Sequence, residues 1–255
     1  NEIEQNNEIE QINEIEPMNE IESCENKKNN QQTVSKTKLK PFLKWVGGKT
    51  QIIEQLFEKF PTQIRNYYEP FSGGGSVFIK LLEKMESGDI TVERLFISDI
   101  NPCLIELYLC LKNKSVELIN ELETIKTLFN SVGEIEYPKR HKFNIPKNMS
   151  QSDLKKKGKK GIYYYNRDRF NELLIKRKGG EIMSENEICK LSAYFIFLNK
   201  TSWRGVYREG PSGFNVPYGH YKNSNIYDKD YLLKLSKLFN DYNVDFKQAN
   251  FNTIG

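Results

Sequence analysis

Apolar residues recur at helical spacing in several stretches of this chain of 255 residues. From Lys49 to Phe60 they fall three and four positions apart, and Pro61 ends the run, so we predict a helix with one buried face. Further helices are predicted over 77–84, 102–111, 116–129, 163–176, 188–199 and 231–239. These helices account for the strongest periodicity in the chain.

Three short segments between the helices predict strands. They cover 66–69, 95–98 and the beginning of a strand at 244–246. The first segment leads into a glycine-rich turn and then into the helix over 77–84, which is followed by the second segment. The order strand, glycine turn, helix, strand predicts half of a doubly wound α/β sheet.

The remaining segments lack a regular period. Residues 130–160 crowd lysine and arginine together and end in Lys155-Lys-Lys-Gly-Lys-Lys160, so we predict an exposed loop or insertion there. Residues 203–221 are rich in Gly, Pro and Arg and predict an extended hairpin. Residues 1–24 form four hexads that begin Asn-Glu-Ile-Glu, a period that suits neither a helix nor a coiled coil. We therefore expect 1–40 to be a disordered acidic tail and linker.

The charge is also distributed unevenly between the acidic tail and the rest of the chain. Nine glutamates and no Lys or Arg lie in residues 1–26, so the formal net charge of +4 divides into −9 for that tail and +13 for residues 27–255. A basic folded part favours a polyanionic partner, nucleic acid first. A lysine-rich composition from an AT-rich gene is the alternative explanation.

Cysteine usage and hydropathy exclude several classes. The four cysteines, Cys24, Cys103, Cys110 and Cys189, form no Cys-x-x-Cys pair, so we expect no metal site. Cys103 and Cys110 lie seven residues apart on a predicted apolar helix, which predicts buried thiols. The sequence has no signal peptide and no apolar run of about 18 residues. We therefore expect a cytoplasmic protein that is neither secreted nor bound to a membrane.

The glycine turn Phe71-Ser-Gly-Gly-Gly-Ser76 carries the first candidate chemistry. It follows a strand, so its backbone N–H groups can face a ligand, and Asp99, 24 residues after Gly75, can accept both hydroxyls of a ribose. A glycine triplet alone is equally compatible with a plain turn. The spacing is not Gly-x-Gly-x-x-Gly, and Glu69-Pro70 precede it, which disfavours NAD.

Two segments resemble a known family closely. Pro41-Phe-Leu-Lys-Trp-Val-Gly-Gly-Lys49 and Tyr68-Glu-Pro-Phe-Ser-Gly-Gly-Gly75 resemble the cofactor motifs of the Dam-type, D12-class DNA adenine-N6 methyltransferases. The resemblance extends through Asp99-Ile-Asn101, residues 198–208 and residues 213–221, and leaves out the lysine-rich segment. It implies a Rossmann-like S-adenosylmethionine-dependent methyltransferase sheet with an inserted, mainly helical target-recognition domain that carries a β-hairpin.

The resemblance also implies domain boundaries. Residues 41–112 would form the cofactor-binding part of the methyltransferase domain, and 113–225 the target-recognition domain, including the segment 130–160. Residues 226–255 would return to the methyltransferase domain, which would be incomplete.

By this resemblance the cofactor is S-adenosylmethionine. Trp45 would pack on it, Lys49 would meet its carboxylate and Asp99 would hold its ribose, because an indole face attracts a sulfonium and a carboxylate binds a diol. The residues implied to bind the cofactor are Trp45, Lys49, Glu69, Phe71, Gly73, Gly75 and Asp99. Taken singly, Trp45 is compatible with a core residue and Lys49 with a surface charge, but their joint spacing favours contact with the cofactor.

The resemblance makes double-stranded DNA the partner. The residues implied to bind it are Lys44, Trp203, Arg204, Val206, Arg208, Pro217 and His220. The large aromatic can fill the gap left by an extruded base, the valine can contact a thymine methyl, and the arginines can donate to guanine. His220 stands where many relatives that methylate GATC carry Arg or Lys, so GATC and CATG remain alternative sites. Simple aromatic packing is the other explanation for this segment, and Lys155–Lys160 are either solvated or contact phosphates nonspecifically.

One motif of the family does not occur in these 255 residues. The Asp-Pro-Pro-Tyr loop, which holds the adenine amino group in relatives, would follow a strand shortly after Phe246 to Ile254, just beyond Gly255, so no catalytic residue is assigned within the chain. The chain also has no initiator methionine, and we expect a fragment of a methyltransferase that binds but does not methylate DNA. The alternatives are a DNA-binding protein without catalysis and a methyltransferase acting on RNA or a small molecule. A cognate restriction endonuclease is a further candidate partner.

Overall fold

The structure, a computed structural model, describes residues 38–138, 141–221 and 225–253. The helices are α1 (Ile53–Phe57), α2 (Ser76–Glu86), α3 (Pro102–Asn113), α4 (Ser115–Asn130), α5 (Gln151–Lys155), α6 (Gly158–Lys178), α7 (Glu185–Thr201) and α8 (Lys229–Asp241). The strands are β1 (Gln63–Glu69), β2 (Thr91–Asp99), β3 (Glu209–Gly210), β4 (Gly213–Phe214) and β5 (Asp245–Gln248), and two 3-10 turns are η1 (Trp203–Gly205) and η2 (Phe251–Thr253).

Two expectations concern residues that the structure does not describe. The acidic repeat and nearly all of the predicted tail and linker lie outside the described residues. Gly255, beyond which the Asp-Pro-Pro-Tyr loop is expected, lies outside them as well. The disordered tail and the position of the catalytic loop therefore stay predictions.

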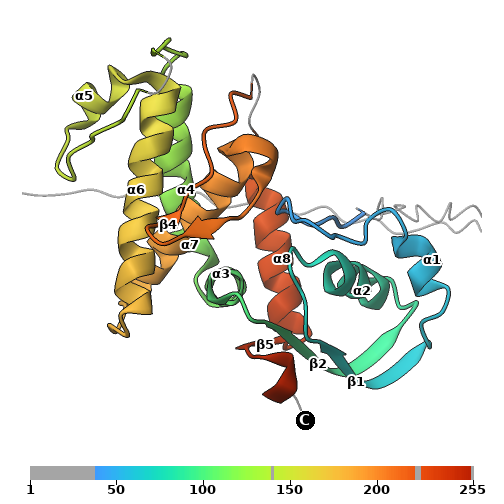
Figure 1. Ribbon diagram of the computed structural model, residues 1–255. Helices are drawn as coiled ribbons and strands as arrows, with labels where there is room; N and C mark the ends of the chain where they lie inside the picture. The colour runs from blue at the N-terminus through green and yellow to red at the C-terminus, as the bar shows by residue number, and fades with distance from the viewer. Residues whose placement is uncertain (1–37, 139–140, 222–224, 254–255) are drawn as a thin grey trace, which may run out of the picture. The chain divides into compact units, whose positions relative to one another are not determined.

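The predicted α/β fold is confirmed. Strands β1, β2 and β5 form a parallel sheet in the order β1-β2-β5, with Tyr68 opposite Phe96 and Asp99 opposite Gln248 (Figure 1). Helix α2 connects β1 to β2, which makes a strand–helix–strand unit of the kind expected from the sequence. Because the strands are parallel, β1 and β2 both end at the same edge of the sheet.

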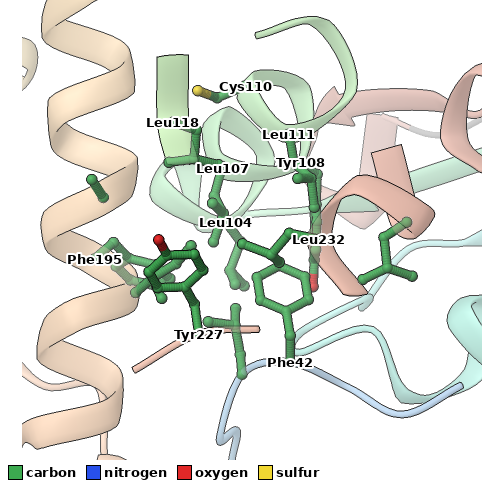
Figure 2. Packing of buried hydrophobic residues seen from close by; sticks show 14 of the residues in the cluster. Phe42, Leu104, Leu107, Tyr108, Cys110, Leu111, Leu118, Phe195, Tyr227 and Leu232 are labelled. Atoms are coloured by element: carbon green, nitrogen blue, oxygen red, sulfur yellow. The ribbon is translucent and has the colours of Figure 1, made fainter. Parts of the chain in front are cut away.

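Helix α3 is the centre of the core. Asn101 caps it by accepting a hydrogen bond from the Cys103 N–H, and the helix is apolar on nearly all sides, which is typical of a helix buried all round. It contacts β2, β5 and α8 as well as α4 and α7. In Figure 2, Phe42 and Leu232 lie beside Tyr108, and Phe195 lies on the other side of the helix. The buried residues beside the sheet and those of the helices α4 and α7 therefore form one core around α3.

The helix predicted over 49–60 is wrong in its extent. Only α1 is helical, and Ile52 is 49% exposed. The Lys49 N–H donates to Ser76 Oγ at 3.0 Å, and Gly47 has a φ of 79°. The residues before α1 therefore form turns, one of which is bonded to the start of α2, and the helix begins only at Ile53.

The loop predicted over 130–160 is also wrong in part. Ser150 caps helix α5 by accepting a hydrogen bond from the Asp153 N–H, and α6 begins at Gly158. Leu154 is buried, so Lys155–Lys160 run from the end of α5 into α6 rather than along a free loop. Residues 150–160 contain few apolar side chains, so hydrophobic periodicity did not reveal α5 or the start of α6.

The hairpin predicted over 203–221 is shorter than expected. Strands β3 and β4 contain two residues each and pair antiparallel, and one further bridge joins Ser202 to Tyr218. Most of the segment is irregular and is held by backbone bonds to the end of α7, such as Gly219 N–H to Thr201 C=O at 2.8 Å.

Replacing Phe239 by alanine tests the packing of α8 against the sheet. The Phe239 ring is fully buried, with its centroid 5.0 Å from that of Phe246 and 5.9 Å from that of Phe78. Phe239→Ala is expected to lower the free energy of unfolding by about 3–5 kcal/mol, measured by urea denaturation. Ile182→Ala, at a side chain that is 94% exposed, should stay within about 0.5 kcal/mol. Equal losses for the two variants would contradict this packing.

Candidate functional site

A cavity of about 1040 Å³ opens at the edge where β1 and β2 end. Three parts of the chain line it: residues in 40–51, residues in 67–77, and Asp99. In parallel α/β sheets, ligands bind outside the carboxyl ends of the strands. The location and the size of the cavity therefore suit a ligand as large as a nucleoside derivative.

The glycine turn is fixed by hydrogen bonds to the next strand and to the core helix. The Gly73 N–H donates to Asp99 Oδ2 at 2.9 Å, and the Asn101 N–H donates to Asp99 Oδ1 at 2.9 Å. The Tyr108 hydroxyl on α3 donates to the Gly73 carbonyl at 2.7 Å. Each carboxylate oxygen of Asp99 has a further lone pair, so both can still accept a hydroxyl of a ligand.

Trp45 lies directly against the glycine turn. A Cβ at Gly73 would lie 2.7 Å from Trp45 Cδ1, and one at Gly74 would lie 2.7 Å from Trp45 Cβ. Gly73 also has a φ of 48°, which disfavours other residues. Gly75 differs, because it is buried outside the lining of the cavity and a Cβ there would collide with Phe78. It shapes the start of α2 instead.

Two opposite charges line the same cavity. Lys49 is exposed, and its Nζ donates to the Gly47 carbonyl at 3.2 Å. Burial raises the pKa of Glu69 to about 7, partly offset by hydrogen bonds from the Tyr67 hydroxyl at 2.7 Å and from the backbone of Phe78. A cation bound beside Glu69 would lower this pKa again.

Six of the seven residues predicted for the cofactor therefore meet at one cavity. They are Trp45, Lys49, Glu69, Phe71, Gly73 and Asp99. The Phe71 side chain is 69% exposed and its ring packs 5.5 Å from that of Phe251. Sequence reasoning missed Ser72, which is buried in the lining and whose Oγ has no hydrogen-bond partner within the described protein. A serine inside the glycine turn was the available signal.

The base of the hairpin presents an aromatic ring and a guanidinium to solvent. Trp203 is 50% exposed, and the Arg204 guanidinium lies 4.4 Å from the centroid of its ring. The Trp203 N–H donates to the carbonyl of the exposed Pro217 at 2.8 Å, which closes the base of the hairpin. Lys44 is exposed, lines the cavity, and places its Nζ 4.3 Å from the centroid of the Tyr221 ring.

The other predicted DNA contacts divide into exposed and packed residues. Arg208 is exposed, and its Nε donates across the hairpin to Asn215 Oδ1 at 2.7 Å. His220 is exposed, with Nδ1 3.6 Å from Glu134 Oε2. Val206 is half-buried and lines a small apolar recess together with residues of α6 and α7. The valine therefore contributes more to packing than the sequence suggested.

The comparison with known families agrees with this geometry. A family described as "D12 class N6 adenine-specific DNA methyltransferase" matches residues 45–254, which include most of the cavity lining and the hairpin. The chain belongs to this family. The resemblance seen in the two glycine-containing motifs is thus explained by membership in this family.

Several curated relatives are similar over most of the chain. The type II methyltransferase M.MjaIII of Methanocaldococcus jannaschii is 39% identical over 212 residues, covering 81% of this chain and 61% of the relative. M1.LlaDCHI of Lactococcus lactis subsp. cremoris is 27% identical over 218 residues, covering 85% and 61%. A DNA adenine methylase of Vibrio cholerae is 28% identical over 186 residues, covering 72% and 50%. The chain thus spans between half and about three fifths of these relatives.

Other kinds of site were sought in the described part of the chain. No helix there has both the length and the apolarity to cross a membrane. The same residues hold no group of three or more His, Cys, Asp or Glu side chains that could bind a metal ion. Cys103 and Cys110 are buried, as predicted, and Cys189 is buried as well. Burial raises the pKa of Cys103 to about 12. Cys24 lies outside the described residues.

Glu69 makes stability depend on pH. Its pKa in the folded protein, about 7, lies above the ordinary value of 4.5, so the protonated carboxyl stabilises the fold fully below about pH 4.5. This contribution is lost as the pH rises through about 7. Relative to Glu69→Gln, which mimics the protonated form, the unfolding free energy of the parent should fall by on the order of 1–3 kcal/mol between these values, measured by urea denaturation.

The exposed Glu58 provides the control for this experiment. Glu58→Gln should change the unfolding free energy by less than about 0.5 kcal/mol at every pH. A difference between the parent and Glu69→Gln that did not vary with pH would contradict the raised pKa.

Proposed function

We propose that this chain supplies the cofactor-binding and DNA-reading parts of an enzyme that methylates adenine in DNA. The enzyme transfers a methyl group from S-adenosylmethionine to the exocyclic amino group of adenine within a short duplex site. The observation that carries the proposal is the convergence of Trp45, Lys49 and Asp99 on one cavity, in a member of an adenine-specific DNA methyltransferase family.

The groups that line the cavity fit the chemistry of S-adenosylmethionine. The Asp99 carboxylate suits the two ribose hydroxyls, Lys49 suits the carboxylate of the amino-acid end, and Glu69 suits its ammonium. The Trp45 ring suits the positive sulfonium, and the unpartnered Ser72 hydroxyl can bond a further polar atom. When bound, this cofactor supplies a methyl group activated by positively charged sulfur. The protein orients the cofactor and places a charge of opposite sign beside each of its charged groups.

The hairpin fits the reading of duplex DNA beside that cavity. An exposed aromatic at Trp203 can occupy the space of an adenine that has left the stack, which is required because the amino group is otherwise inaccessible. Arg204 and Arg208 are exposed and can donate to guanine in the major groove. Lys44 lies where the cavity approaches the hairpin and suits a phosphate or base contact. We assign a GATC or CATG site to this surface.

The alternative function is that of a protein that binds DNA and cofactor without transferring methyl groups. The native protein, incubated with labelled S-adenosylmethionine and duplexes containing GATC or CATG, distinguishes the two. Incorporated label supports the enzyme, whereas binding of both ligands without label supports the alternative.

Replacing Lys49 tests the cofactor site. Lys49→Ala removes a charge-assisted hydrogen bond to the ligand carboxylate and should weaken binding of S-adenosylhomocysteine by about tenfold in isothermal calorimetry. Lys59→Ala removes an exposed lysine outside the cavity and should leave the affinity unchanged. If the folded parent protein releases no heat with this ligand or with S-adenosylmethionine, the cofactor assignment fails.

Replacing Arg208 tests base reading. Arg208→Ala should cost about 1–3 kcal/mol of the preference for the cognate duplex over a scrambled one, measured by fluorescence anisotropy. Arg65→Ala, at an exposed arginine on β1, serves as the matched control and should leave the preference intact. An equal loss on cognate and scrambled duplexes would show that Arg208 contacts phosphate and reads no base.

A further inference from the structure

The segment that carries Trp45 is bonded to the base of the DNA-reading hairpin. Asn199, 5% exposed in the last turn of α7, accepts from the Lys44 N–H at 2.8 Å. Its amide nitrogen donates to the Lys44 carbonyl at 2.7 Å and to the Gly205 carbonyl at 3.1 Å. One buried amide thus joins the backbone beside the cofactor cavity to the backbone of the hairpin.

Gly205 makes the two segments approach very closely. Its φ is 64°, and a Cβ at this position would lie 2.6 Å from Lys44 Cδ and 2.9 Å from the Asn199 carbonyl oxygen. Closely packed groups of this kind transmit displacement because they cannot be compressed. Together with the hydrogen bonds of Asn199, this close approach links the position of the Lys44 backbone to that of the 3-10 turn that presents Trp203.

A second contact joins the same segments through side chains. The Trp45 ring stacks on Tyr207 with centroids 5.8 Å apart and planes at 27°. The Tyr207 hydroxyl donates to the Glu209 carboxylate on β3, which also pairs with Lys178 of α6. Arg208 thus lies between two residues whose side chains are anchored. The same Trp45 side chain lies against the Gly73–Gly74 turn, so it touches both the cofactor cradle and the hairpin.

We propose that Tyr207 and Asn199 are positioning residues that couple occupation of the cofactor cavity to DNA reading by the hairpin. This inference rests on the proposed function. A cofactor that packs on Trp45 restricts the indole, the indole restricts Tyr207, and the residues on either side of Arg208 are then held in place. By thermodynamic linkage each ligand raises the affinity for the other by the same factor, for which about 5- to 150-fold is typical. Neither residue needs to touch a ligand.

The coupling factor is the quantity that tests the proposal. It is the ratio of the dissociation constants for a duplex containing the cognate site without and with saturating S-adenosylhomocysteine, measured by anisotropy at fixed salt. For the parent chain we expect a factor of at least about five. Calorimetry of S-adenosylhomocysteine binding, without and with the duplex, should give the same ratio of dissociation constants. Tyr207→Phe keeps the ring and should keep the factor. Tyr207→Leu removes the stack and should reduce the factor below about two.

The single-ligand affinities separate positioning from simple damage. In Tyr207→Leu, binding of either ligand alone should remain within about threefold of the parent, because neither ligand contact is removed. Tyr194→Leu, at a half-buried tyrosine on α7, should retain the parental factor. Asn199→Asp keeps an acceptor for the Lys44 N–H and loses both amide donors, so it should also lower the factor. It provides an independent variant should Tyr207→Leu not fold, which circular dichroism would reveal.

Each result assigns the failure to one proposal. A parent protein that binds both ligands with a factor of one overturns the coupling and leaves the proposed function standing. Parental coupling in both Tyr207→Leu and Asn199→Asp also overturns it. A folded parent protein that binds neither ligand overturns the proposed function and this inference with it.

Discussion

The arrangement of the site depends on the carboxylate of Asp99. One oxygen accepts the backbone N–H of Gly73 and the other accepts that of Asn101, so a single side chain at the end of β2 fixes both the glycine turn and the start of α3. Tyr108 on that helix returns a hydrogen bond to the Gly73 carbonyl. The sheet, the turn and the central helix are thereby held in one geometry, and the cavity acquires a rigid floor at the carboxyl ends of the strands.

The part of the cavity lining formed by residues 40–51 has a different physical basis. Residues 40–51 contain almost no regular structure, and their position comes from contacts with parts of the chain far away in sequence. Trp45 is packed between the glycine turn and Tyr207, and the backbone of Lys44 is bonded to Asn199. The cavity is therefore complete only when the helices between β2 and β5 have folded against the sheet, so these helices contribute to both of the proposed binding sites.

Local sequence signals predicted the parallel sheet and indicated that the glycine turn lies beside Asp99. The strand, the glycine turn and Asp99 follow one another along the chain, so their proximity needs only the strand–helix–strand connection. Tertiary contacts determined two features that the sequence pattern did not reveal, the length of the first helix and the structure of the lysine-rich run. The bond from Lys49 to Ser76 shortens the first helix, and the burial of Leu154 places a lysine run on helices. The amide of Asn199 in an otherwise apolar helix face was a usable signal, since a buried amide requires partners.

The hairpin alternates between residues held by the protein and residues turned to solvent. Gly205 and Tyr207 are fixed by close packing, whereas Trp203, Arg204 and Arg208 are exposed. Substitutions at the exposed positions cost the fold little, while changes at the fixed positions disturb the scaffold that presents them. Under the proposed function, new preferences for DNA sequence can accordingly arise by exchanging surface side chains on an unchanged backbone, which gives evolution and protein engineering a small set of positions for diversification.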